Sequence, residues 1–199
     1  MHFSKLTSLA VLAVITVTAA HAQILVSGIA TGRFNANAFT VLPNDTQSLL
    51  GLTFRGSTFS DTTSNGFVAF GGTPGNPNTN NFGSMQLDTT PNNYNGNTFT
   101  LRLMFQNPTV VNGDFFADVL GSVSAAGGGG VTINFGPPQT FAWSGGTFTV
   151  DVNDLNINPG LNSSITGNVQ VVPEPATLAT LGLAAIGLVA RRRRKQSRI

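Results

Sequence analysis

Apolar and polar residues alternate with a period of two along most of residues 23–172. In the clearest run, residues 98–106, the apolar positions are Phe99, Leu101, Leu103 and Phe105. This alternation is typical of a strand, because successive side chains of a strand point to opposite faces. Similar runs lie at 50–54, 131–135, 148–152 and 165–171, and weaker ones at 24–29, 66–70, 83–88 and 114–123. The pattern predicts a domain made of many short strands.

Turn-forming residues separate these runs. Proline and glycine gather at 74–77, 127–130, 137–138, 144–146 and 159–160, and such clusters interrupt strands. The Ser-Gly-Gly sequence at 144–146 predicts a β-hairpin between 139–143 and 147–152, and the Asn-rich segment 73–81 predicts a long, mobile surface loop. Because residues 23–172 contain no helical stripe and no repeat, we expect an all-β fold, an antiparallel β-sandwich of jelly-roll-like type.

The N-terminal residues have a different pattern. Residues 1–5 are weakly basic, residues 6–19 are apolar, and Ala20-His21-Ala22 has the small-x-small form of a cleavage site. This order is typical of a secretory signal peptide. We therefore predict a signal peptide over 1–22, which signal peptidase cuts between Ala22 and Gln23. The alternative is a retained membrane anchor, but the apolar run is short for a membrane span.

The C-terminal residues also form three parts in a fixed order. Residues 172–175 read Val-Pro-Glu-Pro, residues 176–190 carry no charge, and a cluster of cations follows at Arg191, Arg192, Arg193, Arg194 and Lys195. The prolines favour an extended chain, and the cluster favours a cytoplasmic C-terminus. The apolar residues predict one hydrophobic helix in the membrane. Fifteen residues span only about 22 Å, less than the hydrocarbon core, so we expect a transient anchor.

The tail 173–199 resembles the PEP-CTERM sorting signal of Gram-negative bacteria that make exopolysaccharide. The resemblance rests on Pro173, Glu174 and Pro175, on the apolar segment 176–190 and on the basic residues from 191. It implies processing by an exosortase, a membrane peptidase. Similar tails have also been labelled an ice-binding-protein C-terminal motif. The body, 23–172, more loosely resembles an uncharacterised domain found with such tails, on segments that include 81–85, 130–135 and 146–150.

The charge of the exported part differs from that of the whole chain. The chain has a formal net charge of +2, but seven of its ten Lys and Arg residues lie in the signal peptide or the tail. Residues 23–172 hold three arginines and seven aspartates, a net charge of −4. Because a surface that binds phosphates is basic, we expect no nucleic-acid partner.

The exported part lacks the usual catalytic side chains. Residues 23–172 contain no His, Cys, Lys or Glu, which excludes Ser-His-Asp and Cys-His catalysis and zinc sites built on His or Cys. Asp114 and Asp118 share a face of one predicted strand, but four residues separate their side chains by ~13 Å, too far for a glycosidase pair. A pair with an aspartate of another strand stays open. We expect no enzyme activity and no cofactor.

Two small groups of residues are candidate ligand sites. Asp151, Asn153 and Asp154, with Asn156 beside them, are oxygen-rich and could hold calcium, although Asp and Asn at a strand end also form turns. Trp143 and Tyr94 could stack on a sugar ring, although the alternation places Trp143 on the same face as the apolar Phe141.

These observations predict where the protein goes better than what it does there. We expect an exported, exosortase-sorted, non-enzymatic protein of the cell surface or extracellular matrix, structural or interacting in type and associated with exopolysaccharide. The alternative is a carbohydrate-binding module, with Trp143, Tyr94 and a calcium site as its binding residues.

Overall fold

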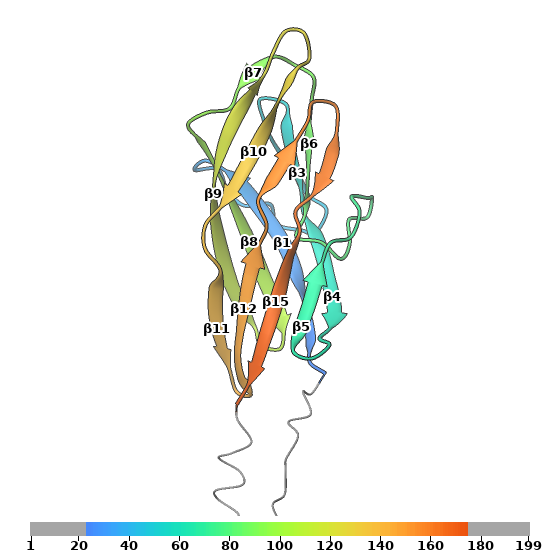
Figure 1. Cartoon of the computed structure of the whole chain (residues 1–199), viewed down its shortest axis with the longest axis vertical. Coiled ribbons are helices and arrows are strands. Elements are labelled where there is room, and N and C mark those ends of the chain that lie inside the picture. The colour runs from blue at the N-terminus through green and yellow to red at the C-terminus, as the bar shows by residue number, and fades with distance from the viewer. Residues whose placement is uncertain (1–22, 175–199) are drawn as a thin grey trace, which may run out of the picture. The chain divides into compact units, whose positions relative to one another are not determined.

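Strands and the turns between them make up residues 23–174, which are the residues that the computed structural model describes (Figure 1). This part of the chain contains no helix, and every pair of neighbouring strands is antiparallel. The predicted all-β class is therefore confirmed. No helix in the range 23–174 is long and apolar enough to cross a membrane. The predicted signal peptide and hydrophobic helix lie outside the described residues.

The largest sheet has seven strands in the order β13-β10-β9-β8-β1-β4, with β7 paired to β9. Its strands are β1 (Leu25–Phe34), β4 (Ser57–Thr62), β7 (Asn92–Asn93), β8 (Asn97–Asn107), β9 (Val111–Val123), β10 (Gly129–Phe135) and β13 (Leu155–Ile157). Three consecutive strands, β8, β9 and β10, are neighbours, so this part of the sheet is a meander that follows the order of the sequence.

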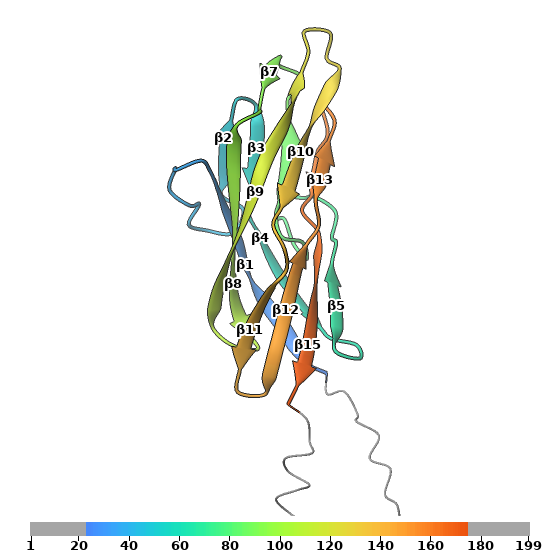
Figure 2. The same cartoon turned by 60° about the vertical axis from the view of Figure 1, so that its left-hand side comes forward.

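Two four-stranded sheets complete the domain. The β15 sheet has the order β11-β12-β15-β5 and comprises β5 (Phe67–Phe70), β11 (Gln139–Trp143), β12 (Gly146–Val152) and β15 (Gly167–Pro173). The β3 sheet has the order β14-β6-β3-β2 and comprises β2 (Thr46–Leu49), β3 (Leu52–Arg55), β6 (Ser84–Leu87) and β14 (Asn162–Ser164). In both views the β15 sheet occupies the lower part of the domain and the β3 sheet the upper part (Figures 1 and 2).

Phenylalanine rings join the three sheets in one core. Phe99 of β8 packs on Phe54 of the β3 sheet, with ring centroids 5.1 Å apart. At the other end of the same strand, Phe105 packs on Phe148 of the β15 sheet, also at 5.1 Å. Because one strand contacts both small sheets through its apolar face, the alternation of β8 determines which face of the large sheet is buried.

The structure corrects two details of the predicted strands. The strand predicted at 24–29 runs on to Phe34, and Gly32 is required there, since a Cβ at Gly32 would lie 2.6 Å from the Phe99 ring. Leu50 was expected on the apolar face of its strand but is 49% exposed. It lies with Gly51 in the turn between β2 and β3, where both residues have positive φ.

The segment 73–81 is not simply the surface loop that was predicted. Asn78 and Asn81 are completely buried, and the Asn81 amide donates to Asn78 Oδ1 at 2.7 Å and to the Gly72 carbonyl at 3.1 Å. Its Oδ1 accepts from the Gly83 amide. Amide side chains can satisfy backbone groups that no strand pairs, so this end of the segment is part of the core.

Hydrogen bonds bring the two ends of the domain together. The Thr63 amide donates to the Ile24 carbonyl, and three residues later the Gly66 carbonyl accepts from the Val171 amide. Between them, Asn65 and Gly66 form the turn from β4 to β5, both with positive φ, as a two-residue hairpin turn requires. The chain therefore enters and leaves the domain at the same end, the lower end in Figure 1.

Candidate functional site

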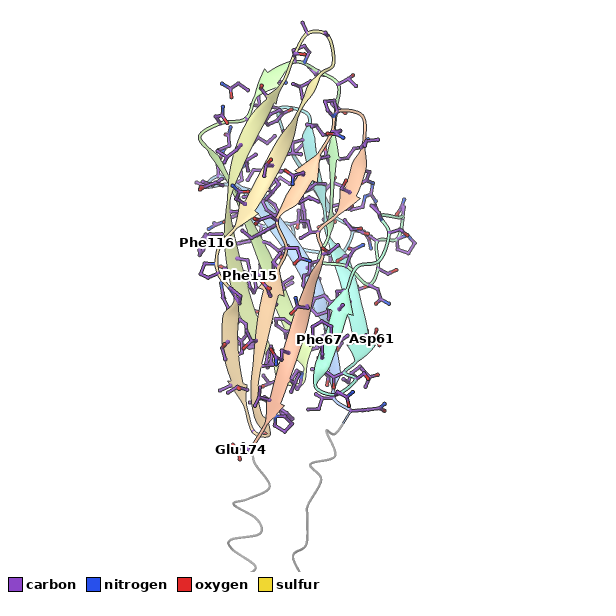
Figure 3. The ribbon with its side chains drawn as sticks, viewed as in Figure 1. Asp61, Phe67, Phe115, Phe116 and Glu174 are labelled. Atoms are coloured by element: carbon purple, nitrogen blue, oxygen red, sulfur yellow. The ribbon has the colours of Figure 1, made fainter. Side chains whose placement is uncertain are left out.

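The described chain ends inside the predicted sorting motif. Val172 and Pro173 belong to β15 and pair with Thr147 and Gly146 of β12. The Glu174 amide then donates to the Gly145 carbonyl at 2.8 Å, while the Glu174 side chain is exposed. Figure 3 shows Glu174 at the lower end of the domain. The first residues of the motif are thus part of the sheet, because β15 runs to Pro173, one residue past the predicted domain end at 172. The Glu174 carboxylate is exposed to solvent.

Trp143 supports this junction from the neighbouring hairpin. The predicted hairpin is confirmed: β11 and β12 pair from Gln139↔Val150 to Trp143↔Gly146. The Trp143 ring lies against Gly145, where an added Cβ would come within 2.4 Å of the ring. The ring is half-buried against the core, and its Nε1 is buried without a hydrogen-bond partner among the described residues. Trp143 therefore packs on the turn whose carbonyl binds Glu174.

Tyr94 does not form a ligand site with Trp143, and this corrects the pairing suggested by residue type. The Tyr94 side chain is completely buried, and its hydroxyl donates to the Leu50 carbonyl at 2.7 Å. Burial raises the pKa of Tyr94, and the nearby Asp88 carboxylate adds to the effect. An enclosed ring cannot stack on a sugar. Tyr94 follows β7, which Figure 1 shows at the upper end, whereas Trp143 ends β11 at the lower end.

In the oxygen-rich group at 151–156, the side chains of Asn153, Asp154 and Asn156 make hydrogen bonds to separate partners. The Asn153 amide donates to Thr166 Oγ1 at 2.8 Å, and Asp154 Oδ1 accepts from the Phe135 amide at 2.8 Å. Asn156 Oδ1 accepts from the Thr132 hydroxyl. In the stretch 23–174, no three His, Cys, Asp or Glu side chains come together as a metal site. These hydrogen bonds fasten the connection between β12 and β13 to neighbouring strands.

Asp114 and Asp118 lie on one face of β9, as their spacing predicts, but in different surroundings. Asp114 forms a two-pronged ion pair with Arg102 of β8, at 2.6 Å to Nε and 2.7 Å to Nη2. The hydrogen bond with Asp114 raises the pKa of Arg102. The Asp118 carboxylate is exposed and makes no hydrogen bond within the described part of the chain. Only Asp118 is therefore available to a ligand.

Asp118 belongs to a groove on the outer face of the seven-stranded sheet, which we call the outer-face groove. The groove has a volume of about 760 Å³, and its walls include Arg33, Thr98, Phe116, Asp118, Asn134 and Phe135. This size is typical of small-molecule sites, which range over ~300–1,000 Å³. Phe116 is 63% exposed, and Figure 3 shows it on β9, well above Glu174.

The register of four strands assembles this groove. Arg33 of β1, Thr100 of β8 and Phe116 of β9 lie opposite one another in one row. In the next row, Thr98 of β8, Asp118 of β9 and Asn134 of β10 are opposite one another. Side chains opposite each other on neighbouring strands share a face and lie within contact distance. Arg33 and Asn134, which are 101 positions apart in the sequence, therefore line one groove.

A loop from β1 fixes the position of Arg33 at the edge of the groove. The Phe39 ring lies between two guanidinium groups, with Arg33 Cζ 4.5 Å and Arg102 Cζ 3.9 Å from its centroid. Such contacts are attractive because the face of the ring is electron-rich. Arg33 Nε is buried without a partner among the described residues, and Arg33 has no ion pair in that range. Phe39 therefore positions the Arg33 guanidinium, and no carboxylate of the described residues neutralises its charge.

Comparison with known proteins identifies the tail. The family model of the PEP-CTERM protein-sorting motif matches residues 171–194. The chain therefore carries this sorting signal, which marks an exported protein that is processed by an exosortase and sorted to the cell surface. No curated protein and no solved structure matches the chain.

Sequence reasoning thus located the sorting residues but not the groove. Glu174 and Pro173 lie at the junction described above, whereas Ala22, Pro175, the apolar segment 176–190 and Arg191, Arg192, Arg193, Arg194 and Lys195 lie outside the described residues. Gln23 is the first described residue. A signal for Phe116 was present: of two adjacent phenylalanines in an alternating strand, one must point outward.

Proposed function

We propose that this protein is a non-enzymatic component of the cell surface or extracellular matrix, delivered by its sorting signal and associated with exopolysaccharide. The observation that carries the proposal is the match to the sorting motif at 171–194 on a domain that has no His, Cys, Lys or Glu between residues 23 and 172. The tail determines where the protein is delivered. The domain supplies a polar surface with few charged groups, three arginines and seven aspartates.

The domain organisation of the proposal has three parts. A signal peptide, 1–22, directs export; an exported domain follows at 23–172; and the sorting signal occupies 173–199. The domain is a two-layer β-sandwich, in which the β15 and β3 sheets pack on one face of the seven-stranded sheet. Contacts such as Phe59 of β4 with Phe70 of β5, at 5.1 Å between ring centroids, support this layering.

The tail acts as a transient anchor in this proposal. Its apolar segment 176–190 enters the membrane and the basic cluster from Arg191 holds the C-terminus on the cytoplasmic side. The exosortase then cuts the chain near Glu174. Glu174 is exposed directly after β15, so in this proposal an enzyme can reach the motif next to the folded domain.

The proposal that the domain is not an enzyme is supported by the surroundings of its aspartates, which are the only acidic residues between 23 and 172. Asp114 is neutralised by Arg102 at 2.6 Å, and Asp154 accepts a backbone hydrogen bond. Hydrolysis of a glycosidic bond needs two cooperating carboxyl groups roughly 5–9.5 Å apart, and the outer-face groove contains one, that of Asp118.

Mass spectrometry of surface material tests the proposal. In a host with an exosortase, we expect a released form that lacks the residues beyond about 175, recovered with the surface polysaccharide. The same host without the exosortase should retain the whole chain in its membrane. Finding only the full-length chain in the inner membrane of the exosortase-bearing host would contradict the proposal, as would release that does not depend on the enzyme.

A further inference from the structure

The outer-face groove has features of a binding site that the sorting signal does not explain. Phe116 stands between two hollows, the groove of about 760 Å³ and a second hollow of about 220 Å³ lined by Pro137, Pro138 and Gln139. Phe116 is 63% exposed, so its ring is accessible to a ligand at the border of both hollows. A ring with a depression on each side offers a flat surface that an extended molecule can cross.

Hydrogen-bonding groups of both kinds surround this ring. The Asp118 carboxylate accepts, the Asn134 amide donates and accepts, and the Arg33 guanidinium donates. The side chains of Asp118 and Asn134 are exposed and make no hydrogen bonds within the described residues, and they lie opposite each other across β9 and β10. The partly exposed Arg33 side chain likewise has no ion pair in that part of the chain. A ligand with many hydroxyl groups would satisfy all three.

The charges favour a neutral ligand. One free cation, Arg33, and one free anion, Asp118, border the groove, so their charges balance. The exported part as a whole carries a net charge of −4, which repels a polyanion at long range. The ligand chemistry that remains is uncharged, rich in hydroxyl groups and flat enough on one face to cover an aromatic ring.

We propose that the outer-face groove binds a neutral polysaccharide chain. Phe116 stacks on the apolar face of one sugar ring, because polarised C–H groups are attracted to the electron-rich face of an aromatic ring. Asp118, Asn134 and Arg33 bind hydroxyl groups of the same or the next sugar. This inference rests on the proposed surface function and names its ligand class, and it places the site on Phe116 rather than on Trp143 and Tyr94.

Calorimetric titration of the full-length chain in detergent tests the inference. The probes are neutral oligosaccharides of glucose, mannose and galactose, with an oligomer of uronic acids as the anionic comparison. We expect at least one neutral oligosaccharide to bind, and the variant Phe116→Ala to bind it about tenfold or more weakly, a change of ~1.4 kcal/mol. Asp118→Asn should weaken binding less, since its oxygen still accepts a hydrogen bond.

Matched control variants come from β4 and β5, which contribute no residue to the groove. Phe67 of β5 is 49% exposed, and Asp61 of β4 is also exposed; Figure 3 labels both, away from Phe116. Phe67→Ala and Asp61→Asn should bind the oligosaccharide as the unaltered chain does. Equal losses in Phe67→Ala and Phe116→Ala, binding of the uronic acid oligomer alone, or no binding of any neutral probe would overturn the inference. So would a dimer that Phe116→Ala dissociates, because a second copy would then occupy the groove.

The inference and the proposed function can fail separately. Release by the exosortase is measured on Phe116→Ala in the same host, and it should equal that of the unaltered chain because Phe116 lies far from Glu174 (Figure 3). Neutral-sugar binding without exosortase-dependent release would contradict the proposed function alone. Release without sugar binding would contradict the inference alone.

Discussion

The lower end of the domain and the outer face of its largest sheet use aromatic residues in opposite ways. At the lower end, Trp143 is packed against Gly145 and supports the turn that binds the Glu174 backbone. On the outer face, Phe116 is 63% exposed and polar side chains flank it. Residue type alone favours tryptophan as the ligand-binding residue. The surroundings of each ring, rather than its type, determine whether it stabilises the fold or is free to bind.

The two regions also differ in how the sequence specifies them: one is a linear motif, and the other depends on strand pairing. The sorting motif is a short linear sequence, so a peptidase can recognise it in an extended chain. The groove exists only when β1, β8, β9 and β10 pair in one register. Slipping a strand by one residue would turn its groove side chains into the core. We therefore expect changes at the two regions to have separable consequences.

The largest expected effect is the loss of release in Glu174→Ala. Glu174 is the only glutamate of the chain, and its contact with Gly145 uses the backbone amide, which alanine retains. The substitution therefore removes the exposed carboxylate without altering the junction. Immunoblots of cell and surface fractions should show export and anchoring unchanged but no released form. Normal release of Glu174→Ala would show that the carboxylate is not recognised.

The next largest effect is the destabilisation of the domain by Asn81→Ala. This change leaves the buried Gly83 amide and the Asn78 side chain without their partner, and we expect a loss of about 2–3 kcal/mol in the free energy of unfolding. Urea unfolding of the released form measures it. Thr73→Ala, at an exposed position in the same segment, is the control and should change little. Equal effects would contradict the structural role of Asn81.

Trp143→Ala should have a smaller effect on stability and none on sugar binding. The ring is half-buried, so its loss should cost about 1–2 kcal/mol, less than for a fully buried aromatic residue. The unfolding free energy and the affinity for the neutral oligosaccharide are both measured. If Trp143→Ala abolished binding and left stability unchanged, the comparison between the two aromatic residues would be reversed.

The smallest effect concerns alkaline pH. The pKa of Tyr94 in the folded protein is raised above its ordinary value of 10.0, mainly by burial, so the folded state binds the phenolic proton more tightly than the unfolded state. Stability should therefore be constant with respect to this group below pH 10 and fall as the pH rises above it. Tyr94 is the only tyrosine, and residues 23–172 contain no lysine, so Tyr94→Phe should remove most of this fall. If the melting temperature of Tyr94→Phe fell above pH 10 as steeply as that of the unaltered chain, the assignment to Tyr94 would be contradicted.

Much of the fold could be predicted because one face of each strand is buried. Phe99, Leu101, Leu103 and Phe105 are at most 1% exposed, and a buried face on alternate residues is the pattern that sequence shows best. The second half of β1 could not be predicted in this way. Its glycine, Gly32, weakens the strand pattern, and the phenylalanines that fill the space beside it, Phe99 and Phe54, come from distant strands.

The sites show the same division. The sorting signal is local in sequence and could be recognised there, predicted at 173–199 and matched by the family model at 171–194, whereas the groove depends on which strands are neighbours. One local signal was available but not used: Asn65-Gly66 is a strong hairpin sequence, and it forms the turn that brings Ile24 and Val171 together. The burial of Asn78 had no local signal, because the Gly56 carbonyl to which its amide donates lies in a distant part of the sequence.

The central claim is that the tail alone determines the cellular destination of the protein, independently of the domain. Transfer of the tail to another protein tests this claim most directly. Residues 171–199 are fused to an unrelated exported reporter and expressed in paired hosts with and without an exosortase. We predict anchoring in both hosts and release to the surface only in the host with the enzyme. A reporter that is neither anchored nor processed in the exosortase-bearing host would contradict the claim.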